Sequence, residues 1–194
     1  FSFRRNLGKS EALTLGFMKA KGDTSVTLDA DLQDKPSEIA SLLKISRSGI
    51  DLVCGWRKDR KDKKKMLVIS KFFNKLMNSI FGLDIHDYNC GLKVYKSDLA
   101  KNLKLYGGLH RFIPLLAAEN GFTIEEVAIE HDTRKFGKSK YGFSKVFTDL
   151  PDIFTIHFLS RYSKRPLHFF GNIGISFSVI GLSIMIYLTY AHYG

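Results

Sequence analysis

Cysteine is scarce in this chain of 194 residues. Cys54 and Cys90 are the only two, and neither belongs to a C-x-x-C pair or stands at a metal-ligand spacing from a histidine. These absences exclude a disulfide framework and a cysteine-based zinc site. We therefore expect two reduced, structural thiols, which suit a domain that faces the cytosol. The six histidines are scattered, and we assign none of them to a metal.

Charged residues are missing from the end of the sequence, since Leu167 to Gly194 contains no Asp, Glu, Lys or Arg. A helix needs about 20 mainly apolar residues to cross a bilayer, so we predict a transmembrane helix over residues 166–194. Lys164 and Arg165 precede it, and the positive-inside rule then keeps the preceding domain in the cytoplasm. A buried core helix is the alternative, but the glycines within the segment and the tyrosines near its end favour a single membrane span.

Positive charge is plentiful elsewhere, and the formal net charge of +11 calls for an anionic partner. Nucleic acid, acidic lipid headgroups and a phosphorylated substrate all qualify. Basic and aromatic residues do not interleave in the way that stacks bases, so we predict no nucleic-acid partner. Residues 57–65 hold seven basic side chains, which form either a solvated loop or a patch that faces membrane lipid phosphates.

Strand-like and helix-like segments alternate over residues 1–142, which predicts an α/β domain with a largely parallel sheet. We expect strands at residues 24–28, 50–54, 89–95 and 122–131, and helices at 8–19, from 36, at 66–81, from 97 and at 110–120. The first three residues read as the end of a buried strand, so the chain is expected to start inside this domain. Residues 143–165 carry phenylalanines at helical spacing around Pro151 and are expected to form amphipathic interfacial helices, with packing against the sheet as the alternative.

The acidic run Asp29-Ala30-Asp31-Leu32-Gln33-Asp34 follows the first expected strand directly. Ligands of α/β sheets gather at the carboxyl ends of strands. There Asp29 and Asp31 can share a hard cation such as Mg²⁺ or Mn²⁺, which can neutralise a diphosphate, and Gln33 can add a neutral oxygen ligand. A solvated turn or a helix cap is the plainer interpretation of the same residues.

Two basic segments are candidate anion sites. The first, Arg5-Asn6-Leu7-Gly8-Lys9-Ser10, fails the Walker pattern because Phe3 stands where a glycine is required, and it remains either an anion-binding helix start or a structural turn. The second runs from Arg134 to Tyr141. Its Arg, Lys and Ser side chains surround a flexible glycine and can clamp a diphosphate, although a cationic surface loop is an equally simple interpretation.

Several segments, taken in chain order, carry a resemblance to one known family. They are Arg5-Asn6-x-Gly8-Lys9, Asp29-Ala30-Asp31-Leu32-Gln33-Asp34, Gly55-Trp56-Arg57, Asp87-Tyr88-Asn89-Cys90-Gly91-Leu92-Lys93, Arg134-x-x-Gly137-x-Ser139-Lys140-Tyr141 and Arg165-Pro166-Leu167-His168-Phe169-Phe170-Gly171. Together they resemble the family 2 inverting glycosyltransferases of the GT-A fold. More narrowly, they are similar to the polyprenyl-phosphate glycosyltransferases related to dolichol-phosphate mannose synthase and to bacterial undecaprenyl-phosphate glucosyl- and aminoarabinosyl-transferases.

The resemblance implies a GT-A (Rossmann-like) domain that lacks its first strands and the nucleotide-base pocket, followed by a transmembrane helix. It implies that Asp29, Asp31 and Gln33 surround the metal and that Asp29 and Ala30 contact the donor. Arg57 and Lys71 would meet the donor or the lipid phosphate. Arg134, Ser139 and Lys140 would hold the donor phosphates, with Asp31 and Arg134 as the catalytic pair. Lys35 stands where many relatives have proline, and Trp56 stands where serine is common. These differences affect the expected identity of the sugar more than the class of reaction.

The reaction implied is inverting transfer of a sugar from a UDP- or GDP-linked donor to a dolichyl or undecaprenyl phosphate at the cytoplasmic membrane face. The alternatives are a glycosyltransferase that builds a polysaccharide or glycolipid, and a non-catalytic adaptor that binds acidic lipid. The chain lacks the Q-x-x-R-W segment usual in polysaccharide synthases. Assembly into a homo-oligomer is left open by the sequence.

Overall fold

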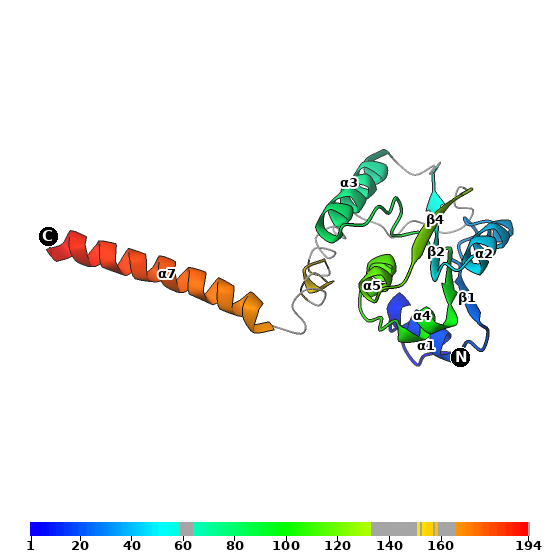
Figure 1. Cartoon of the computed structure of the whole chain (residues 1–194), viewed down its shortest axis with the longest axis horizontal. Helices are drawn as coiled ribbons and strands as arrows, with labels where there is room; N and C mark the ends of the chain where they lie inside the picture. Colours follow the sequence, from blue (N-terminus) through cyan, green and yellow to red (C-terminus); the bar gives the residue numbers. More distant parts are fainter. Residues whose placement is uncertain (59–63, 133–150, 152, 157, 159–165, 194) are drawn as a thin grey trace. The chain divides into compact units, whose positions relative to one another are not determined.

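The computed structural model describes residues 1–58, 64–132, 151, 153–156, 158 and 166–193. The chain divides into two compact units, Phe1–Gly142 and Phe143–Gly194, which are described separately here. Figure 1 shows the helices and strands of both.

The first unit alternates short strands with helices, as the sequence predicts. In chain order its elements are α1 (Lys9–Lys19), β1 (Thr24–Thr27), the 3-10 turn η1 (Pro36–Glu38), α2 (Ile39–Arg47), β2 (Leu52–Arg57), α3 (Lys64–Phe81), β3 (Lys93–Lys96), α4 (Ser97–Asn102), the 3-10 turn η2 (Leu109–Phe112), α5 (Ile113–Glu119) and β4 (Ile124–Ile129).

The four described strands form one mixed sheet in the order β1-β3-β2-β4. Only β2 and β4 pair in parallel, because β3 lies antiparallel to both β1 and β2. The expectation of a largely parallel sheet is therefore wrong for two of the three pairings, although β1, β2 and β4 point the same way. The reversed β3 starts where β1 ends, with Lys93 opposite Thr27, so the residues just before β3 lie beside the acidic run.

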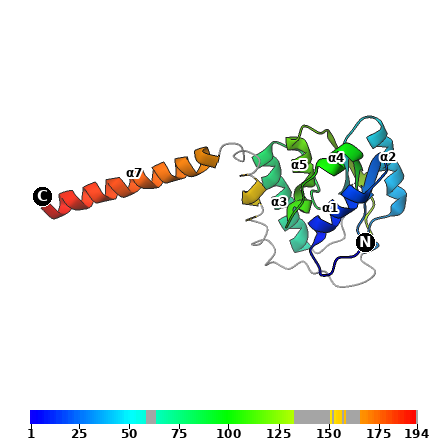
Figure 2. The ribbon, with the colours of Figure 1, turned by 90° about the horizontal axis from the view of Figure 1, so that it is seen from below.

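Helices cover both faces of this sheet (Figures 1 and 2). On one face, Leu42 of α2 packs in a buried cluster with Val53, Val94 and Ile129 from three strands. On the other face, α4 and α5 contact the strands, α1 packs against α4, and the Phe17 and Tyr95 rings lie 4.9 Å apart. Full burial of each such side chain contributes about 1.5–3 kcal/mol, which makes these two apolar layers the main source of the unit's stability.

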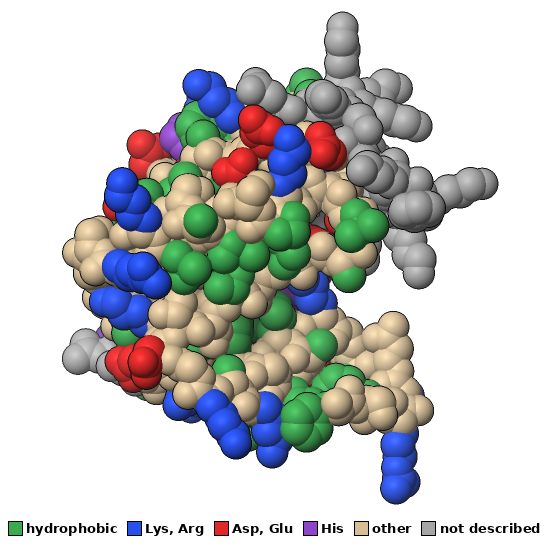
Figure 3. Space-filling model, turned by 90° about the vertical axis from the view of Figure 1, so that its right-hand side faces the viewer, with side chains coloured by type: hydrophobic (Ala, Val, Ile, Leu, Met, Phe, Trp, Pro, Cys, Tyr) green, Lys and Arg blue, Asp and Glu red, His purple; other side chains and the backbone are tan. Residues whose placement is uncertain are grey.

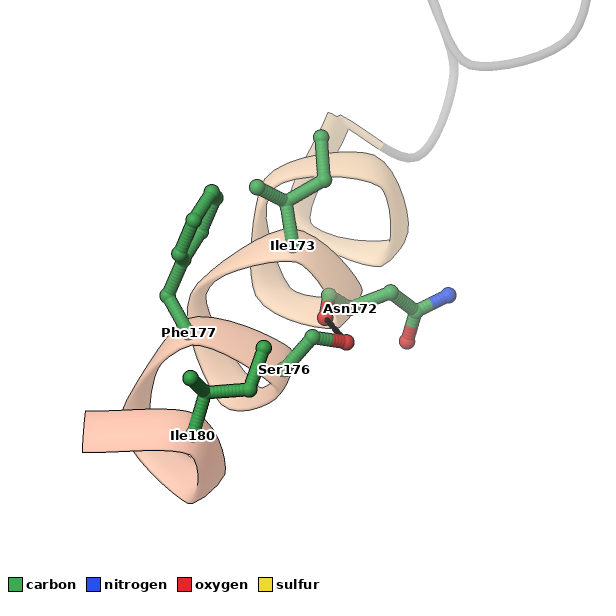
Figure 4. A pocket seen from close by; sticks show the side chains of 5 residues that line it. All are labelled: Asn172, Ile173, Ser176, Phe177 and Ile180. Carbon is green, nitrogen blue, oxygen red and sulfur yellow. Dashed lines mark hydrogen bonds between the residues drawn. The ribbon is translucent and has the colours of Figure 1, made fainter. Parts of the chain in front are cut away.

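The second unit contains α7 (Pro166–Tyr193). Its stretch Pro166–His192 is long and apolar enough to cross a membrane, by length and composition, and no residue of its most apolar window is buried. Residues 151, 153–156 and 158 are helical, and the Phe158 ring contacts those of Phe169 and Phe170 at 5.3 and 5.6 Å. Most of the stretch expected to form interfacial helices lies outside the described residues. Figure 4 shows an open depression on α7, which is lined by Asn172, Ile173, Ser176, Phe177 and Ile180 and contains no ionisable side chain.

Candidate active site at the carboxyl edge of the sheet

Asp29 follows β1 and lies against the backbone of Gly91. A Cβ atom at position 91 would lie 2.5 Å from Asp29 Oδ2 and 2.8 Å from Oδ1, so no side chain fits there. On its other side Asp29 Oδ1 accepts a hydrogen bond from Lys9 Nζ at 2.6 Å. The side chains of Lys9 and Asp29 are 44% and 40% exposed, so this carboxylate is held in place while remaining open to a ligand.

The segment that carries Gly91 is fixed by buried contacts. Thr27 Oγ1, at the end of β1, donates to the Gly91 carbonyl at 2.8 Å. Lys93 is buried, and its ammonium donates to the carbonyls of Tyr88, at 3.1 Å, and Cys90. In the sequence, Gly91 and Lys93 are recognisable only as members of the motif at residues 87–93. Their roles depend on the reversed β3, which the local pattern does not reveal.

Asp31 and Gln33 belong to the turn that continues from Asp29. Leu32 has a left-handed φ of 59°, and Asp31 Oδ1 accepts from the Gln33 backbone N–H at 3.3 Å. Gln33 is hydrogen-bonded to the segment that follows β4: its Nε2 donates to the Asp132 carbonyl at 3.1 Å, and its own carbonyl accepts from Asp132 N at 2.9 Å. The structure thus gathers Asp29, Ala30, Asp31 and Gln33 in one turn at the carboxyl edge.

The next residue anchors the turn in the core. Asp34 is buried, and its Oδ1 lies 3.0 Å from Nδ1 of the buried His131 side chain. The same two residues form an antiparallel β-bridge. Asp34 therefore anchors the turn through its buried contact with His131 and does not face a ligand.

The oxygen ligands in this turn suit a hard divalent cation. Carboxylate and amide oxygens are what Mg²⁺ and Mn²⁺ prefer. Within the described ranges, no three His, Cys, Asp or Glu side chains cluster as a metal site. A site of two carboxylates and one amide fits a cation that is completed by the ligand's own phosphate oxygens. Asp29 also meets the positive charge of Lys9, which indicates that this position stabilises a cation.

Arg57 ends β2 at the same edge and is engaged by Asp87. Its Nε and Nη2 donate to the two Asp87 oxygens at 2.7 and 3.0 Å, and the two side chains are 13% and 2% exposed. Burial lowers the pKa of Arg57, but the hydrogen bonds and the negative charge of Asp87 raise it by a larger amount. The pKa therefore lies above its ordinary value, and Arg57 stays a cation at any working pH. The predicted contact of Arg57 with a phosphate stays a prediction.

Lys71 lies on the exposed side of α3, together with Lys75 and the apolar Val68 and Phe72. Helical spacing from Lys71 and Lys75 predicts Asn78 on the same face, and this prediction is wrong. Asn78 points inward, where it exchanges hydrogen bonds with Ile85 and accepts one from Tyr88 Oη at 2.9 Å.

The remaining predicted site residues, Arg134, Ser139 and Lys140, lie outside the described residues. On the face shown in Figure 3, the described Lys and Arg side chains are spread around the edge, with Asp and Glu among them. Charge alone therefore does not locate a site on this face.

Both cysteines are free and buried, which confirms the expectation of structural thiols. Burial raises the pKa of Cys54 to about 12 and that of Cys90 to about 11. Thiols with such pKa values carry no thiolate near neutral pH, so neither acts as a nucleophile.

A mixed sheet between helical layers, with an acidic turn at its carboxyl edge, defines the class of GT-A-like α/β proteins. Residues 1–104, more than half of the chain, match Glycosyl transferase family 2. The chain belongs to this family, which confirms the resemblance seen in the motifs.

Two relatives are similar over almost the whole chain. Dodecaprenyl-phosphate galacturonate synthase of Rhizobium johnstonii is 39% identical over 189 residues, which make up 95% of this chain and 56% of the relative. Undecaprenyl-phosphate 4-deoxy-4-formamido-L-arabinose transferase of Edwardsiella ictaluri is 35% identical over 180 residues, or 91% of this chain and 55% of the relative. The chain thus spans about half the length of these relatives.

Among solved structures, the fold is similar to glucosyl-3-phosphoglycerate synthase from Mycobacterium tuberculosis in complex with Mn²⁺ and uridine-diphosphate-glucose. The TM-score is 0.57 at 19% identity, with 82% of this chain and 56% of that chain covered. At this identity the likeness shows the fold alone, and it confirms the GT-A-like architecture expected from the sequence.

Proposed function

We propose that the protein containing this chain transfers a sugar from a UDP- or GDP-linked donor to a polyprenyl phosphate, with inversion, at the cytoplasmic face of a membrane. The observation that carries the proposal is the Asp29–Asp31 turn, which lies at the carboxyl edge beside Lys9 and Gly91. The names of both relatives include a polyprenyl phosphate, which supports the acceptor class. The apolar α7 supports a membrane location, and Lys164 and Arg165 before it support the orientation.

In this proposal Asp29 and Asp31 hold Mg²⁺ or Mn²⁺ through their carboxylate oxygens, with Gln33 as a neutral ligand. The solved structure with Mn²⁺ and uridine-diphosphate-glucose supports a divalent cation in this fold. When bound, such a cation offsets the negative charge that develops on a departing nucleoside diphosphate. Gly91 leaves room for the Asp29 carboxylate, and the Lys9 ammonium occupies that carboxylate until a cation binds.

The acceptor phosphate is an anion near neutral pH, so the nucleophile needs no general base to form. Arg134, Ser139 and Lys140 are assigned from the sequence to the donor phosphates, where Arg134 would stabilise the leaving group with a two-pronged hydrogen bond. Arg57 and Lys71 are assigned to the donor or the lipid phosphate. In-line attack from the far side of the sugar then inverts the anomeric carbon.

The test is Asp31→Asn in the full-length, membrane-embedded protein, assayed for transfer of labelled sugar to undecaprenyl phosphate across a panel of nucleotide sugars. Loss of one carboxylate ligand is expected to lower metal-dependent transfer by about 100-fold or more. Asp98→Asn is the matched control, since Asp98 is exposed on α4, where its Oδ1 accepts a hydrogen bond from Asn102 Nδ2. Transfer by Asp31→Asn at the level of the control would overturn the proposal.

A further inference from the structure

Glu126, in the middle of β4, is a nearly buried carboxylate that the sequence analysis did not single out. Its side chain is 9% exposed. Oε2 accepts a hydrogen bond from the His86 backbone N–H at 2.7 Å and lies 2.9 Å from His86 Nδ1, while Oε1 accepts from the Asp87 backbone N–H at 3.0 Å. One side chain thus holds the backbone of two consecutive residues that are about 40 positions away in the sequence.

The same two residues are held from β2. The Trp56 ring stacks on the His86 ring, with centroids 4.2 Å apart and an interplanar angle of 24°. Arg57 makes its paired hydrogen bonds to Asp87. Residues 86 and 87 are therefore clamped between neighbouring strands, by Glu126 on one side and by the end of β2 on the other.

The segment that begins at this clamp ends at the acidic turn. Asp87 Oδ1 accepts from the Asn89 backbone N–H at 3.2 Å, and Lys93 holds the Tyr88 and Cys90 carbonyls. The next residue, Gly91, is the surface against which Asp29 packs. Residues 86–91, which we call the clamp loop, thus run continuously from Glu126 to the proposed metal ligand.

We propose that Glu126 is a positioning residue that sets the Asp29 site through the clamp loop. The inference rests on the proposed function, because it assigns to Glu126 an effect on the affinity for the metal and the nucleotide. Glu126 itself touches neither of them. Its two carboxylate oxygens each accept from one backbone N–H group of the loop. In a neutral amide one of these oxygens is replaced by an NH2 group, which cannot accept a hydrogen bond. Release of the loop lets Gly91 shift, and Asp29 loses its fixed position.

The test compares Glu126→Gln with Glu125→Gln in the full-length protein. Glu125 lies next to Glu126 on β4 and is exposed, so the two variants lose the same charge on the same strand. Mn²⁺ affinity in the presence of UDP or GDP, measured by electron paramagnetic resonance, is expected to fall about 10- to 100-fold for Glu126→Gln, as for partners that orient metal ligands. Hydrogen exchange of the clamp-loop amides, measured without metal, is expected to rise in the same variant only.

The outcomes separate this inference from the proposed function. If wild type binds neither Mn²⁺–UDP nor Mn²⁺–GDP, the proposed function fails and the inference fails with it. If wild type binds one of them and Glu126→Gln binds it equally well, only the inference is overturned, even when that variant is less stable. Should Glu126→Gln not fold, Glu126→Asp keeps the charge with a shorter reach, and it is expected to show an intermediate loss of affinity; wild-type affinity in Glu126→Asp would likewise overturn the inference.

Discussion

At the level of single residues, the acidic turn is defined by what surrounds its carboxylates. Asp29 has Gly91 on one side and the Lys9 ammonium on the other, and both neighbours come from other parts of the chain. Asp31 could be predicted as a metal ligand from the sequence because it lies two residues after Asp29, where an apolar strand ends. Lys9 appeared in the sequence only as part of a basic turn, since nothing local shows that its side chain reaches a carboxylate 20 residues away.

In the proposed function, Lys9 competes with the divalent cation for the Asp29 carboxylate. A half-exposed ion pair of this kind is worth about 1 kcal/mol or less, so Lys9→Met is expected to tighten the binding of Mn²⁺ alone by about two- to fivefold. Equilibrium Mn²⁺ titration of the nucleotide-free, full-length protein measures this. Lys35→Met is the control, because Lys35 pairs with Glu130 on the surface instead. Weaker Mn²⁺ binding by Lys9→Met would show that Lys9 supports the metal site rather than competing for it.

At the level of elements, the predicted strand ends were wrong where the strand depends on a distant partner strand. The first strand was expected at residues 24–28 and is found at Thr24–Thr27, because its apolar pattern and the acidic turn define it locally. The second was expected to end at Cys54, yet it continues to Arg57, because Trp56 and Arg57 pair with Ala128 and Ile129 of β4. The paired residues are 72 positions apart in the sequence, so the local pattern does not reveal this pairing.

The contact between α1 and η2 shows the same dependence on distant partners. The position of Ser10 near the start of the helix predicts a helix cap, but Ser10 lies inside α1 and is buried. Its Oγ donates to the Gly107 carbonyl at 2.8 Å. Since that hydroxyl proton is used, Oγ accepts from the His110 backbone N–H at 3.2 Å and from His110 Nδ1 at 3.0 Å. Burial, assisted by the positive charges of Lys9 and Arg111, lowers the pKa of His110 to about 4, so this imidazole is neutral near neutral pH.

This depressed pKa predicts an acid-dependent loss of stability. The unfolded state takes up the His110 proton from about pH 6.5 downward, whereas the folded state resists it until about pH 4. The stabilisation is complete above that range and is lost as the pH falls through it. After allowance for partial exposure, the free energy of unfolding is expected to be about 1 kcal/mol lower at pH 5 than at pH 7.

Chemical denaturation of the detergent-solubilised protein at the two pH values measures this effect. His110→Asn removes the titrating group but keeps a polar side chain, so its stability is expected to change less over the same interval. Equal losses in wild type and His110→Asn would show that other groups cause the acid sensitivity.

The whole molecule contains an acidic turn at the edge of a sheet and an apolar helix of membrane-spanning length. The sequence predicted the order of strands and helices along the chain, the family and the acidic turn. Each of these depends on local sequence patterns. The reversed β3, the clamp loop and its Glu126 anchor were not predicted, because they depend on pairings between distant segments. These pairings give the turn its fixed geometry, which the proposed chemistry requires.

The most direct test of the central claim is the position of Mn²⁺ in the full-length protein bound to a nucleoside diphosphate, located by anomalous scattering from crystals. The account predicts a peak within coordination distance of Asp29 and Asp31, with the diphosphate on the same cation. A manganese peak bound elsewhere, with both carboxylates facing only protein or water, would contradict it.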